Sequence, residues 1–312
     1  MLRRPRLNCS SISVQSVAAI DGDVLVYRTG FAGQQTLVSA VLADGSVIVD
    51  GAKNKTECLQ ELERLGVPEH DCSFRKEVTL DSANHVVHSL NVQLERIMDC
   101  TRASKFHVFL TGSGNFRSVL AKTLPYKGNR VAEKPEYYEF LREKIKSRWK
   151  GTVVPGAEAD DAIAIKGAEG AVMCTLDKDL RQVPGLHFNW TKDLGIEEVN
   201  VDDGTLFLFQ QALAGDSTDN IPGIPGIGLK KAEKYLLEMG CYGRTFTQYI
   251  QACEGFYGIH GLQPERFVEC FNLVYMCRTI EELRRAKQIA SEGGPGLSPE
   301  SVEAARLCVP TV

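Results

Sequence analysis

The sequence of 312 residues has no uninterrupted apolar run near the roughly 20 residues that a membrane-spanning helix needs. Its six histidines do not cluster with its ten cysteines, and no two cysteines have the C-x-x-C spacing. The signatures of a zinc site and of a disulfide framework are therefore missing, which favours reduced thiols in a cytoplasmic compartment. We predict a soluble protein without a membrane partner.

The composition, with 43% hydrophobic and 24% charged residues, is that of an ordinary globular protein. The first 20 residues carry three arginines and no acid, which is typical of organellar transit peptides and also of disordered extensions. We predict a disordered tail over residues 1–16. The remaining length allows one large domain or two modest ones.

The formal net charge of −4 argues against a nucleic-acid partner until its distribution is considered. Residues 117–150 hold ten Lys or Arg and four Glu, a net of +6, whereas residues 151–219 hold thirteen acids and four bases, a net of −9. A basic block followed by an acidic one suggests a phosphate-binding surface beside a cation site. Solvated helix faces are the alternative explanation.

Strand and helix patterns alternate up to about residue 200 and predict an α/β domain with a largely parallel sheet. The predicted strands are residues 17–20, 106–110, 153–154 and 171–175. The predicted helices are residues 54–65, 84–98, 136–149, 158–167, 203–214, 229–239, 264–278 and one after Ser298. We therefore expect a core over residues 17–200 and a helical region over residues 201–312.

Short acidic groups recur where predicted strands end or predicted helices begin. They are Asp21 with Asp23; Glu158, Asp160 and Asp161; Asp177 with Asp179; and Asp216 with Asp219. Because the carboxyl ends of parallel strands share one edge of a sheet, we expect these side chains to meet in one cleft. Each group alone also fits a turn or a helix cap, but four groups together favour a shared site.

Carboxylates that converge in a cleft repel one another unless cations neutralise them. Oxygen ligands without histidine or cysteine favour Mg²⁺ or Mn²⁺. Two such ions about 4 Å apart can activate a water, orient a phosphate and stabilise the leaving oxygen. The acids therefore predict phosphodiester hydrolysis.

A Gly/Pro-rich segment at residues 221–228 (IPGIPGIG), followed by LKKAEKYL, has the form of a helix-hairpin-helix. Gly226 and Gly228 would let backbone N–H groups approach a phosphate, and the next helix adds its positive N-terminal end. Lys230 and Lys231 would neutralise neighbouring phosphates, which predicts duplex binding without sequence preference. A purely structural turn is the alternative.

Residues 126–130 (YKGNR) place the ring of Tyr126 beside Lys127 and Arg130. Bases can stack on such a ring while the two cations contact phosphates. A solvated loop is the alternative explanation for this segment.

With these residues in view, the sequence resembles the flap endonuclease superfamily, and within it the bacteriophage-type 5′-to-3′ exonucleases. The matching segments, in the order of the family, are IDGDVLVYR (20–28), NFRSVLAKTLPYKGNRVAEKP (115–135), EADDAI (158–163), TLDKDLRQVPG (175–185) and GDSTDNIPGIPGIGLKKA (215–232). The resemblance implies a PIN/FEN-like mixed sheet flanked by helices. It also implies a nuclease core with an arch over residues 117–150, and a helix-hairpin-helix (H3TH) that holds duplex DNA.

Carried over residue by residue, the resemblance implies two metal groups. The first comprises Asp21, Glu158 and Asp160, with Asp161 alongside, and the second comprises Asp177, Asp179 and Asp219, with Asp216 close by. Lys127 and Arg130 match the arch cations that contact the scissile phosphate, and Tyr126 matches the neighbouring aromatic residue. The phosphate-binding hairpin is matched by Gly223, Gly226, Gly228 and Lys230, and family members can hold K⁺ there.

One position departs from the family. Many members carry an Asp after the strand that corresponds to residues 106–110, but here Leu110 is followed by Thr-Gly-Ser-Gly-Asn. No Asp or Glu lies between Asp99 and Glu133. The first metal group thus lacks one expected carboxylate.

We therefore predict a magnesium-dependent 5′-to-3′ exonuclease or flap endonuclease in which a metal-activated water attacks the phosphate and Lys127 and Arg130 stabilise the developing charge. The expected partners are DNA with 5′ ends, nicks or flaps, and RNA primers in RNA–DNA hybrids, during DNA replication or repair. We expect a monomer in the cytoplasm, that of the host if the chain is viral. The alternatives are a catalytically weakened, structure-specific DNA-binding protein and a small-RNA nuclease on a related core.

Overall fold

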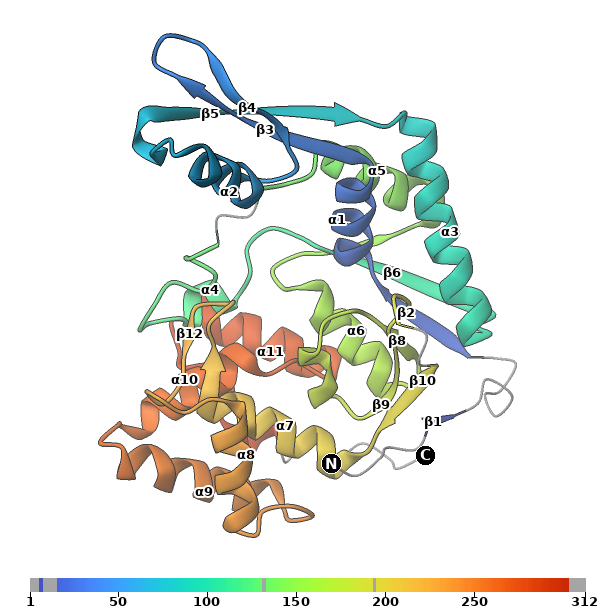
Figure 1. Cartoon of the computed structure of the whole chain (residues 1–312). Helices are drawn as coiled ribbons and strands as arrows, with labels where there is room; N and C mark the ends of the chain where they lie inside the picture. The colour runs from blue at the N-terminus through green and yellow to red at the C-terminus, as the bar shows by residue number, and fades with distance from the viewer. Residues whose placement is uncertain (1–5, 8–15, 131–132, 193–194, 303–312) are drawn as a thin grey trace. The chain divides into compact units, whose positions relative to one another are not determined.

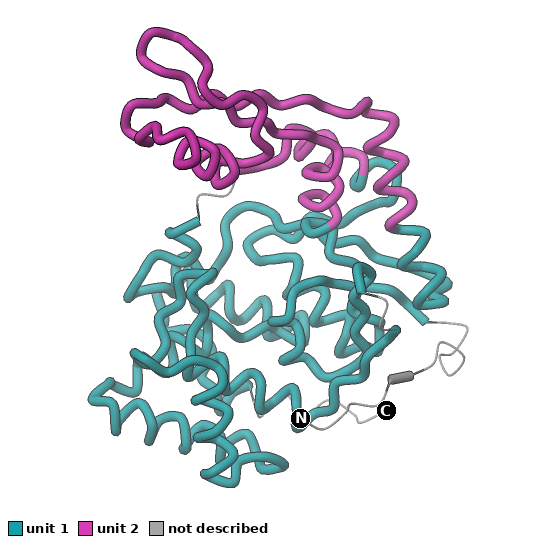
Figure 2. The backbone as a smooth tube through the Cα atoms, viewed as in Figure 1, with its two compact units in different colours: residues 1–24, 94–132, 145–312 teal, residues 25–93, 133–144 magenta. Residues whose placement is uncertain are grey.

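The computed structural model describes residues 6–7, 16–130, 133–192 and 195–302, so most of the predicted tail lies outside the described residues. The chain forms two compact units (Figure 2). Unit 1 comprises Met1–Val24, Leu94–Ala132 and Ile145–Val312, and unit 2 comprises Leu25–Gln93 and Glu133–Lys144. Every predicted site residue belongs to unit 1. The predicted division into a core over residues 17–200 and a helical region over residues 201–312 stays a prediction.

In the described part of unit 1, a seven-stranded sheet forms the centre (Figure 1). In sheet order, its strands are β1 (Arg6–Leu7), β10 (Ile196–Val199), β9 (Gly185–Phe188), β8 (Val172–Cys174), β2 (Val17–Asp21), β6 (Lys105–Thr111) and β7 (Thr152–Val154). Neighbours from β9 to β7 pair in parallel, whereas β10 pairs antiparallel with β9 and β1. The mixed, largely parallel sheet predicted from the sequence is confirmed.

The central strand β2 is apolar because both of its faces are covered. Ala18, Ala19 and Ile20 are fully buried, and α6 (Ala159–Ala168) packs against β2, β6 and β8. Continuous apolar runs are typical of parallel strands buried on both faces. Asp21, the last residue of β2, pairs in register with Phe109 of β6 and therefore stands at the carboxyl edge of the sheet.

Helices dominate unit 1 after residue 201, as predicted. They are α7 (Val201–Ala214), α8 (Leu229–Glu238), α9 (Phe246–Ile259), α10 (Pro264–Val274) and α11 (Ile280–Ser291). Shorter elements of unit 1 are α4 (Arg117–Leu120), η3 (Asp179–Gln182) and the ribbon formed by β11 (Gly215–Asp216) and β12 (Ile221–Pro222). Residues 299–302 are helical too, and the rest of the helix predicted after Ser298 lies outside the described residues.

The helix predicted over residues 264–278 ends early, at Val274. The next residues are extended because their backbone groups bind buried side chains. The Tyr275 carbonyl accepts a hydrogen bond from Arg117 Nη2 at 2.6 Å, and the Cys277 N–H donates to Asp161 Oδ1 at 3.1 Å. Tertiary contacts thus override the helical pattern here.

Unit 2 contains a three-stranded antiparallel sheet that the sequence did not reveal. Its order is β4 (Val47–Ala52), β3 (Gln34–Leu42) and β5 (Cys72–Leu80). Helix α2 (Lys55–Leu65) packs against β3 and β4, and the short η2 (Glu69–Asp71) precedes β5. Val38, Ala40, Val49, Ala52, Cys58 and Leu62 form a small core of their own.

The boundary between the units falls within α1 (Gly22–Ala32), α3 (Ala83–Thr101) and α5 (Tyr138–Trp149).

Within the described ranges, no helix combines the length and apolar character that crossing a membrane requires.

Candidate active site and nucleic-acid interface

Asp21 is held at the sheet edge by its neighbours in the chain and in the sheet. Its residue is only 4% exposed, and its carboxylate accepts hydrogen bonds from the Val24 N–H and from Thr175 Oγ1, each at 2.9 Å. Gly22 follows because a Cβ at that position would lie 2.5 Å from the Phe109 carbonyl oxygen. The close approach of β2 and β6 therefore fixes where Asp21 presents its charge.

The second acidic group opens α6. Glu158 is the N-cap residue and forms a capping box with Asp161. Its carboxylate also accepts a hydrogen bond from Asn115 Nδ2 at 2.9 Å. Helix capping thus places Glu158 at the same sheet edge as Asp21, with Asp160 in the first turn behind it.

Asp161 is placed differently from the prediction that put it beside the first metal group. It is fully buried, and both of its oxygens accept hydrogen bonds from Arg117, at 2.7 and 2.8 Å. Arg117 is itself buried and also donates to the Leu273 carbonyl at 3.1 Å. A carboxylate committed to a bidentate arginine pair is poorly available to a metal ion, so Asp161 acts in the packing of α6.

The third and fourth acidic groups come from loops at the same edge. Thr175 Oγ1 accepts a hydrogen bond from the Asp177 N–H at 3.0 Å, and Asp177 Oδ1 accepts one from the Asp179 N–H at 2.8 Å. At the end of β11, Asp216 Oδ1 accepts a hydrogen bond from the Thr218 N–H at 2.7 Å. Local turns therefore aim these acids.

Shared hydrogen-bond partners bring acids from separate segments together, and their pKa values shift accordingly. Burial raises the pKa of Asp21 to about 7, and the charges of Asp23 and Asp177 raise it further. Burial also raises the pKa of Asp160, with added rises from Asp21, Asp177 and Glu158. Groups far apart in the sequence thus feel one another's charge, as the shared edge of the sheet predicts.

The loop groups behave in the same way. Loss of hydration raises the pKa of Asp177, and the charges of Asp219 and Asp216 add to the rise. Burial raises the pKa of Asp179 to about 8, with further rises from Asp177 and Asp216. Eight acids, which we call the acidic cluster, are linked in this way: Asp21, Asp23, Glu158, Asp160, Asp177, Asp179, Asp216 and Asp219.

Two cations of the 125–130 loop enter the acidic cluster. Lys127 Nζ forms an ion pair with Glu158 and another, at 3.5 Å, with Asp219, while Arg130 Nη2 pairs with Asp219. Lys127 has a left-handed backbone with φ of 56°, and its N–H donates to the Asp219 carbonyl at 2.8 Å. Backbone and side chain together hold Lys127 between the two predicted metal groups.

Tyr126 points its hydroxyl into the cluster. Its Oη lies 3.1 Å from Glu158 Oε2 and 3.0 Å from Asp219 Oδ2, and its ring packs on the core of unit 1. Burial, followed by the charge of Glu158, raises the pKa of this hydroxyl, which therefore stays protonated as a donor. Stacking of bases on this ring stays a prediction.

Thr111 and Asn115 lie at and just after the end of β6, where another acid was expected, and both make polar contacts. Thr111, at the end of β6, accepts a hydrogen bond from the Ala159 N–H through Oγ1 at 3.0 Å and donates its own N–H to Asp23 at 2.8 Å. Asn115 binds Glu158 through its amide. Neutral side chains thus hold α6 against the sheet edge at the place where we expected another carboxylate.

The donor chemistry of the acidic cluster suits hard divalent ions, because carboxylate oxygens are its metal-binding atoms. Among the residues that the structure describes, no three His, Cys, Asp or Glu side chains are yet close enough to enclose an ion. Burial raises these pKa values most and repulsion between the carboxylates adds to the rise, and a bound cation would relieve that repulsion. The carboxylates therefore suit a hard divalent cation in charge and ligand type.

The helices predicted over residues 203–214 and 229–239 are α7 and α8, a β11–β12 ribbon that was not predicted lies between them, and the glycines differ in role. A Cβ at Gly223 would lie 2.2 Å from the Ala214 carbonyl carbon and 2.4 Å from the Gly215 nitrogen, so Gly223 allows the ribbon to close. At Gly226 and Gly228 an added Cβ would meet nothing within 4 Å. These two glycines leave open backbone, and Gly228 is the N-cap of α8.

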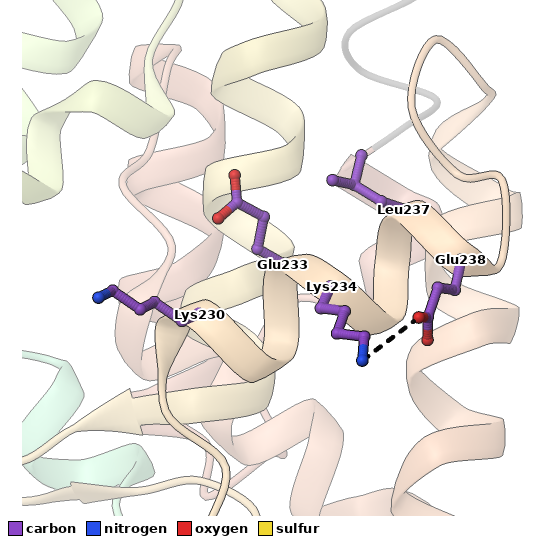
Figure 3. A pocket seen from close by; sticks show the side chains of 5 residues that line it. All are labelled: Lys230, Glu233, Lys234, Leu237 and Glu238. Atoms are coloured by element: carbon purple, nitrogen blue, oxygen red, sulfur yellow. Dashed lines mark ion pairs between the residues drawn. The ribbon is translucent and has the colours of Figure 1, made fainter. Parts of the chain in front are cut away.

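The predicted phosphate-binding lysines begin α8. Lys231 Nζ donates to the Gly226 carbonyl at 2.9 Å. Lys230 is exposed and lines a surface depression with Glu233, Lys234, Leu237 and Glu238 (Figure 3). Both lysines thus lie by the uncapped N-terminal end of the helix, where its dipole favours an anion.

Sequence reasoning missed three residues that organise the site. Thr175 joins two acidic groups, Asn115 binds Glu158, and Arg117 neutralises Asp161. Thr175 had a signal, because a threonine after a buried strand and before Asp177 is a common turn former. Arg117 stands among apolar residues, which could have indicated a buried pair. Asn115 had no such signal.

Comparison with known proteins gives partial matches. No protein-family model matches the chain. A flap endonuclease from a Shewanella species is 39% identical over 159 residues, which cover 46% of this chain and 58% of the relative. The exodeoxyribonuclease of enterobacteria phage T3 is 33% identical over 129 residues, which cover 38% of this chain and 42% of that one. DNA polymerase I of Rhizobium leguminosarum is 37% identical over 134 residues, only 13% of its length. In each case the match spans less than two thirds of the relative.

A solved structure of a bacteriophage T5 flap endonuclease, in complex with DNA and metal ions, has a TM-score of 0.50 to this chain at 17% identity. The match covers 69% of this chain and 89% of that one. At this identity the likeness concerns the fold. The chain thus has a fold like that of a phage flap endonuclease, and its sequence is similar to 5′-to-3′ exonucleases and flap endonucleases, which confirms the resemblance seen in its motifs.

Proposed function

We propose that this chain is a divalent-metal-dependent 5′-to-3′ exonuclease and flap endonuclease that hydrolyses phosphodiester bonds of DNA. One observation carries the proposal: acids from separate segments share bonding partners, because Thr175 binds Asp21 and Asp177, and Lys127 pairs with both Glu158 and Asp219. Concentrated negative charge beside fixed cations suits bound metal ions and a bound phosphate. Similarity to named nucleases supports DNA with 5′ ends, nicks or flaps as the substrate.

The acidic cluster would hold two ions, Mg²⁺ or in its place Mn²⁺. Asp21, Glu158 and Asp160 would bind the first, and Asp177, Asp179 and Asp219, with Asp216 close by, the second. Bound ions of this kind supply a Lewis acid for the phosphate and lower the pKa of the attacking water. Asp161 is left out because Arg117 occupies both of its oxygens.

Lys127 and Arg130 would bind the scissile phosphate and stabilise the charge that develops on its oxygens. Their ion pairs with Glu158 and Asp219 support this role, because the pairs place both cations beside predicted metal ligands, where the scissile phosphate would bind. The backbone N–H of Lys127 is already fixed by the Asp219 carbonyl, so the cation is oriented before substrate arrives. No protein side chain is needed as nucleophile.

The open backbone at Gly226 and Gly228, with Lys230 and Lys231, would hold the duplex by its phosphates. K⁺ at this hairpin, cutting of RNA in RNA–DNA hybrids, stacking on Tyr126, a monomeric state and a cytoplasmic location belong to the same proposal and rest on the resemblance.

A magnesium titration with 5′-labelled flap, nicked and blunt DNA tests the proposal. We expect cleavage that depends on the metal, and a loss of at least about a hundredfold in rate for Asp177→Ala, equivalent to about 3 kcal/mol of transition-state stabilisation. Exposed Glu254→Ala on α9 is the matched control and should cut like the wild type.

Two outcomes contradict the proposal: no cutting at any concentration of Mg²⁺ or Mn²⁺, or full activity in Asp177→Ala. Tight flap binding without cutting would instead favour a DNA-binding protein that has lost catalysis. Thr111 and Asn115 in place of an acid motivate that second reading. Faster cutting of single-stranded RNA than of flap DNA would favour an RNA nuclease.

A further inference from the structure

A single carboxylate on α10 holds the start of the loop that carries Tyr126, Lys127 and Arg130. Glu269 Oε1 accepts hydrogen bonds from the backbone N–H groups of Lys122, at 2.7 Å, and Thr123, at 2.8 Å. Its other oxygen accepts a hydrogen bond from Thr123 Oγ1 at 2.7 Å. Three donors from two successive residues thus converge on one side chain.

Arg266, one turn earlier on α10, completes the arrangement. Its Nη1 pairs with Glu269 Oε2 and donates to Thr123 Oγ1, and its Nη2 donates to the Pro222 carbonyl at 3.0 Å. The two side chains are only 22% and 10% exposed. We call Thr123, Pro222, Arg266 and Glu269 the α10 anchor. It joins the 121–130 loop and the β11–β12 ribbon to helix α10.

Glu269 is ionised in this anchor. Burial works against its charge, but the hydrogen bonds from Thr123 and Lys122 outweigh that effect and lower the pKa of Glu269. Hydrogen bonds to an ionised carboxylate are shorter and stronger than those between neutral groups. The anchor is therefore a firm tie rather than a loose surface contact.

The 121–130 loop needs such a tie because it contains neither helix nor strand. Farther along, it is held at the Asp219 carbonyl by the Lys127 N–H, and at Pro125 by Asn220 Nδ2 at 2.9 Å. These contacts join the 121–130 loop to the loop between β11 and β12. The α10 anchor ties both of these segments to α10. If the anchor fails, loop and acidic cluster can shift relative to each other.

We propose that Glu269 is a positioning residue that sets the placement of Lys127 and Arg130 over the acidic cluster, and that Arg266 ties this placement to the β11–β12 ribbon. The catalytic consequence rests on the proposed nuclease function. The structural consequence, a loosened loop on removal of Glu269, does not.

The experiment compares Glu269→Ala and Glu269→Gln with Glu265→Ala, an exposed acid on the same helix. Hydrogen–deuterium exchange reports on residues 121–130, and single-turnover cleavage of 5′-flap DNA over a range of enzyme concentrations separates the maximal rate from the half-saturating concentration. We expect faster exchange of the loop in Glu269→Ala and a maximal rate lower by about ten- to a hundredfold, as for a small misplacement of catalytic groups. The half-saturating concentration should stay near the wild-type value.

Glu269→Gln keeps an acceptor for the two N–H groups and loses the charge, so it should fall between Glu269→Ala and the wild type. Unchanged exchange at residues 121–130 in both variants overturns the proposal, as does an unchanged maximal rate, or a loss that appears only in the half-saturating concentration. If Glu269→Ala unfolds, the local exchange of Glu269→Gln decides. If the wild-type chain cuts no substrate, the nuclease proposal fails, and the exchange data still judge the anchor.

Discussion

At the scale of single residues, Asp21 stabilises the fold least when it is ionised. Its pKa rises from 3.8 to about 7, so the folded chain binds this proton more tightly than the unfolded chain does. The contribution of Asp21 to stability is therefore greatest below about pH 4 and falls as pH rises to about 7. Asp179, whose pKa is raised to about 8, extends the fall.

Asp21→Asn should therefore stabilise the chain when divalent ions are removed. The amide oxygen can still accept the hydrogen bond from the Val24 N–H, and no buried charge remains. We expect the free energy of unfolding, measured with urea in EDTA at pH 8, to rise by about 1–2 kcal/mol. At pH 5, which lies between the two pKa values of Asp21, the difference should be smaller than at pH 8.

Glu254→Gln on the exposed face of α9 serves as the control and should leave the pH dependence unchanged. If Asp21→Asn unfolds with the same pH dependence as the wild type, the buried charge of Asp21 does not destabilise the fold. Added Mg²⁺ should stabilise the wild type more than the variant, because the ion relieves a repulsion that the variant lacks.

The same residues explain how far the site could be read from the sequence. Asp21, Asp177 and Asp216 each accept a backbone hydrogen bond two or three residues farther along the chain, as turn and cap residues do. Each of these acids thus forms a local turn or cap and also belongs to the acidic cluster. Asp161 looked like its neighbours in sequence, but its partner Arg117 lies 44 residues away, and no local pattern predicts such a pair.

At the scale of elements, boundaries were predictable where the cap residue was local. Asn54 caps α2 through its side chain, and Glu158 caps α6, so both helices begin where the sequence indicates. β3 and β4 form a local hairpin around Asp44-Gly45, whose turn signal was overlooked, whereas β5 pairs with β3 from farther along the chain and is mostly exposed. Pairing of that kind leaves a weak local pattern.

The glycines of the hairpin give a test at this scale. Gly223→Ala should cost several kcal/mol, because the new Cβ would overlap the backbone of Ala214 and Gly215 and must force the ribbon apart. Gly228→Ala should cost less than about 1 kcal/mol, since its backbone φ is −100° and the Cβ would enter open space. Urea unfolding measures both.

DNA affinity should separate the same two variants in another way. Gly228→Ala keeps its fold and should bind flap DNA more weakly, because the methyl group enters the space where backbone approaches a phosphate. Equal stability of the two variants would contradict the tight crossing of Gly215 and Gly223. Wild-type affinity in Gly228→Ala would remove this glycine from the interface.

At the scale of the whole molecule, the acidic and basic blocks of the sequence correspond only in part to the two compact units. The acidic block of residues 151–219 lies in unit 1 and supplies most of the acidic cluster, as its sequence predicts. The basic block of residues 117–150 is divided, because residues 133–144 belong to unit 2. A run of like charges in the sequence thus does not have to belong to one compact unit.

Salt dependence tests whether the cations of α8 act on nucleic acid despite the net charge of −4. In EDTA, where no metal-dependent cutting occurs, the affinity for duplex DNA should fall linearly with salt on logarithmic axes, with a slope of about −0.9 for each neutralised phosphate. Removing both cations in Lys230→Ala with Lys231→Ala should make the slope shallower by about 0.9 for each lysine that contacts a phosphate.

Lys166→Ala is the matched control, because Lys166 is a cation of unit 1 that pairs with Glu169 on the surface near the end of α6. Its slope should equal that of the wild type if Lys166 contacts no phosphate, since only cations that neutralise phosphates release counterions from DNA and set the slope. If the double variant kept the wild-type slope, the α8 lysines would not face the phosphates. If Lys166→Ala changed the slope as much, binding would depend on net charge, and a defined duplex site at the hairpin would be ruled out.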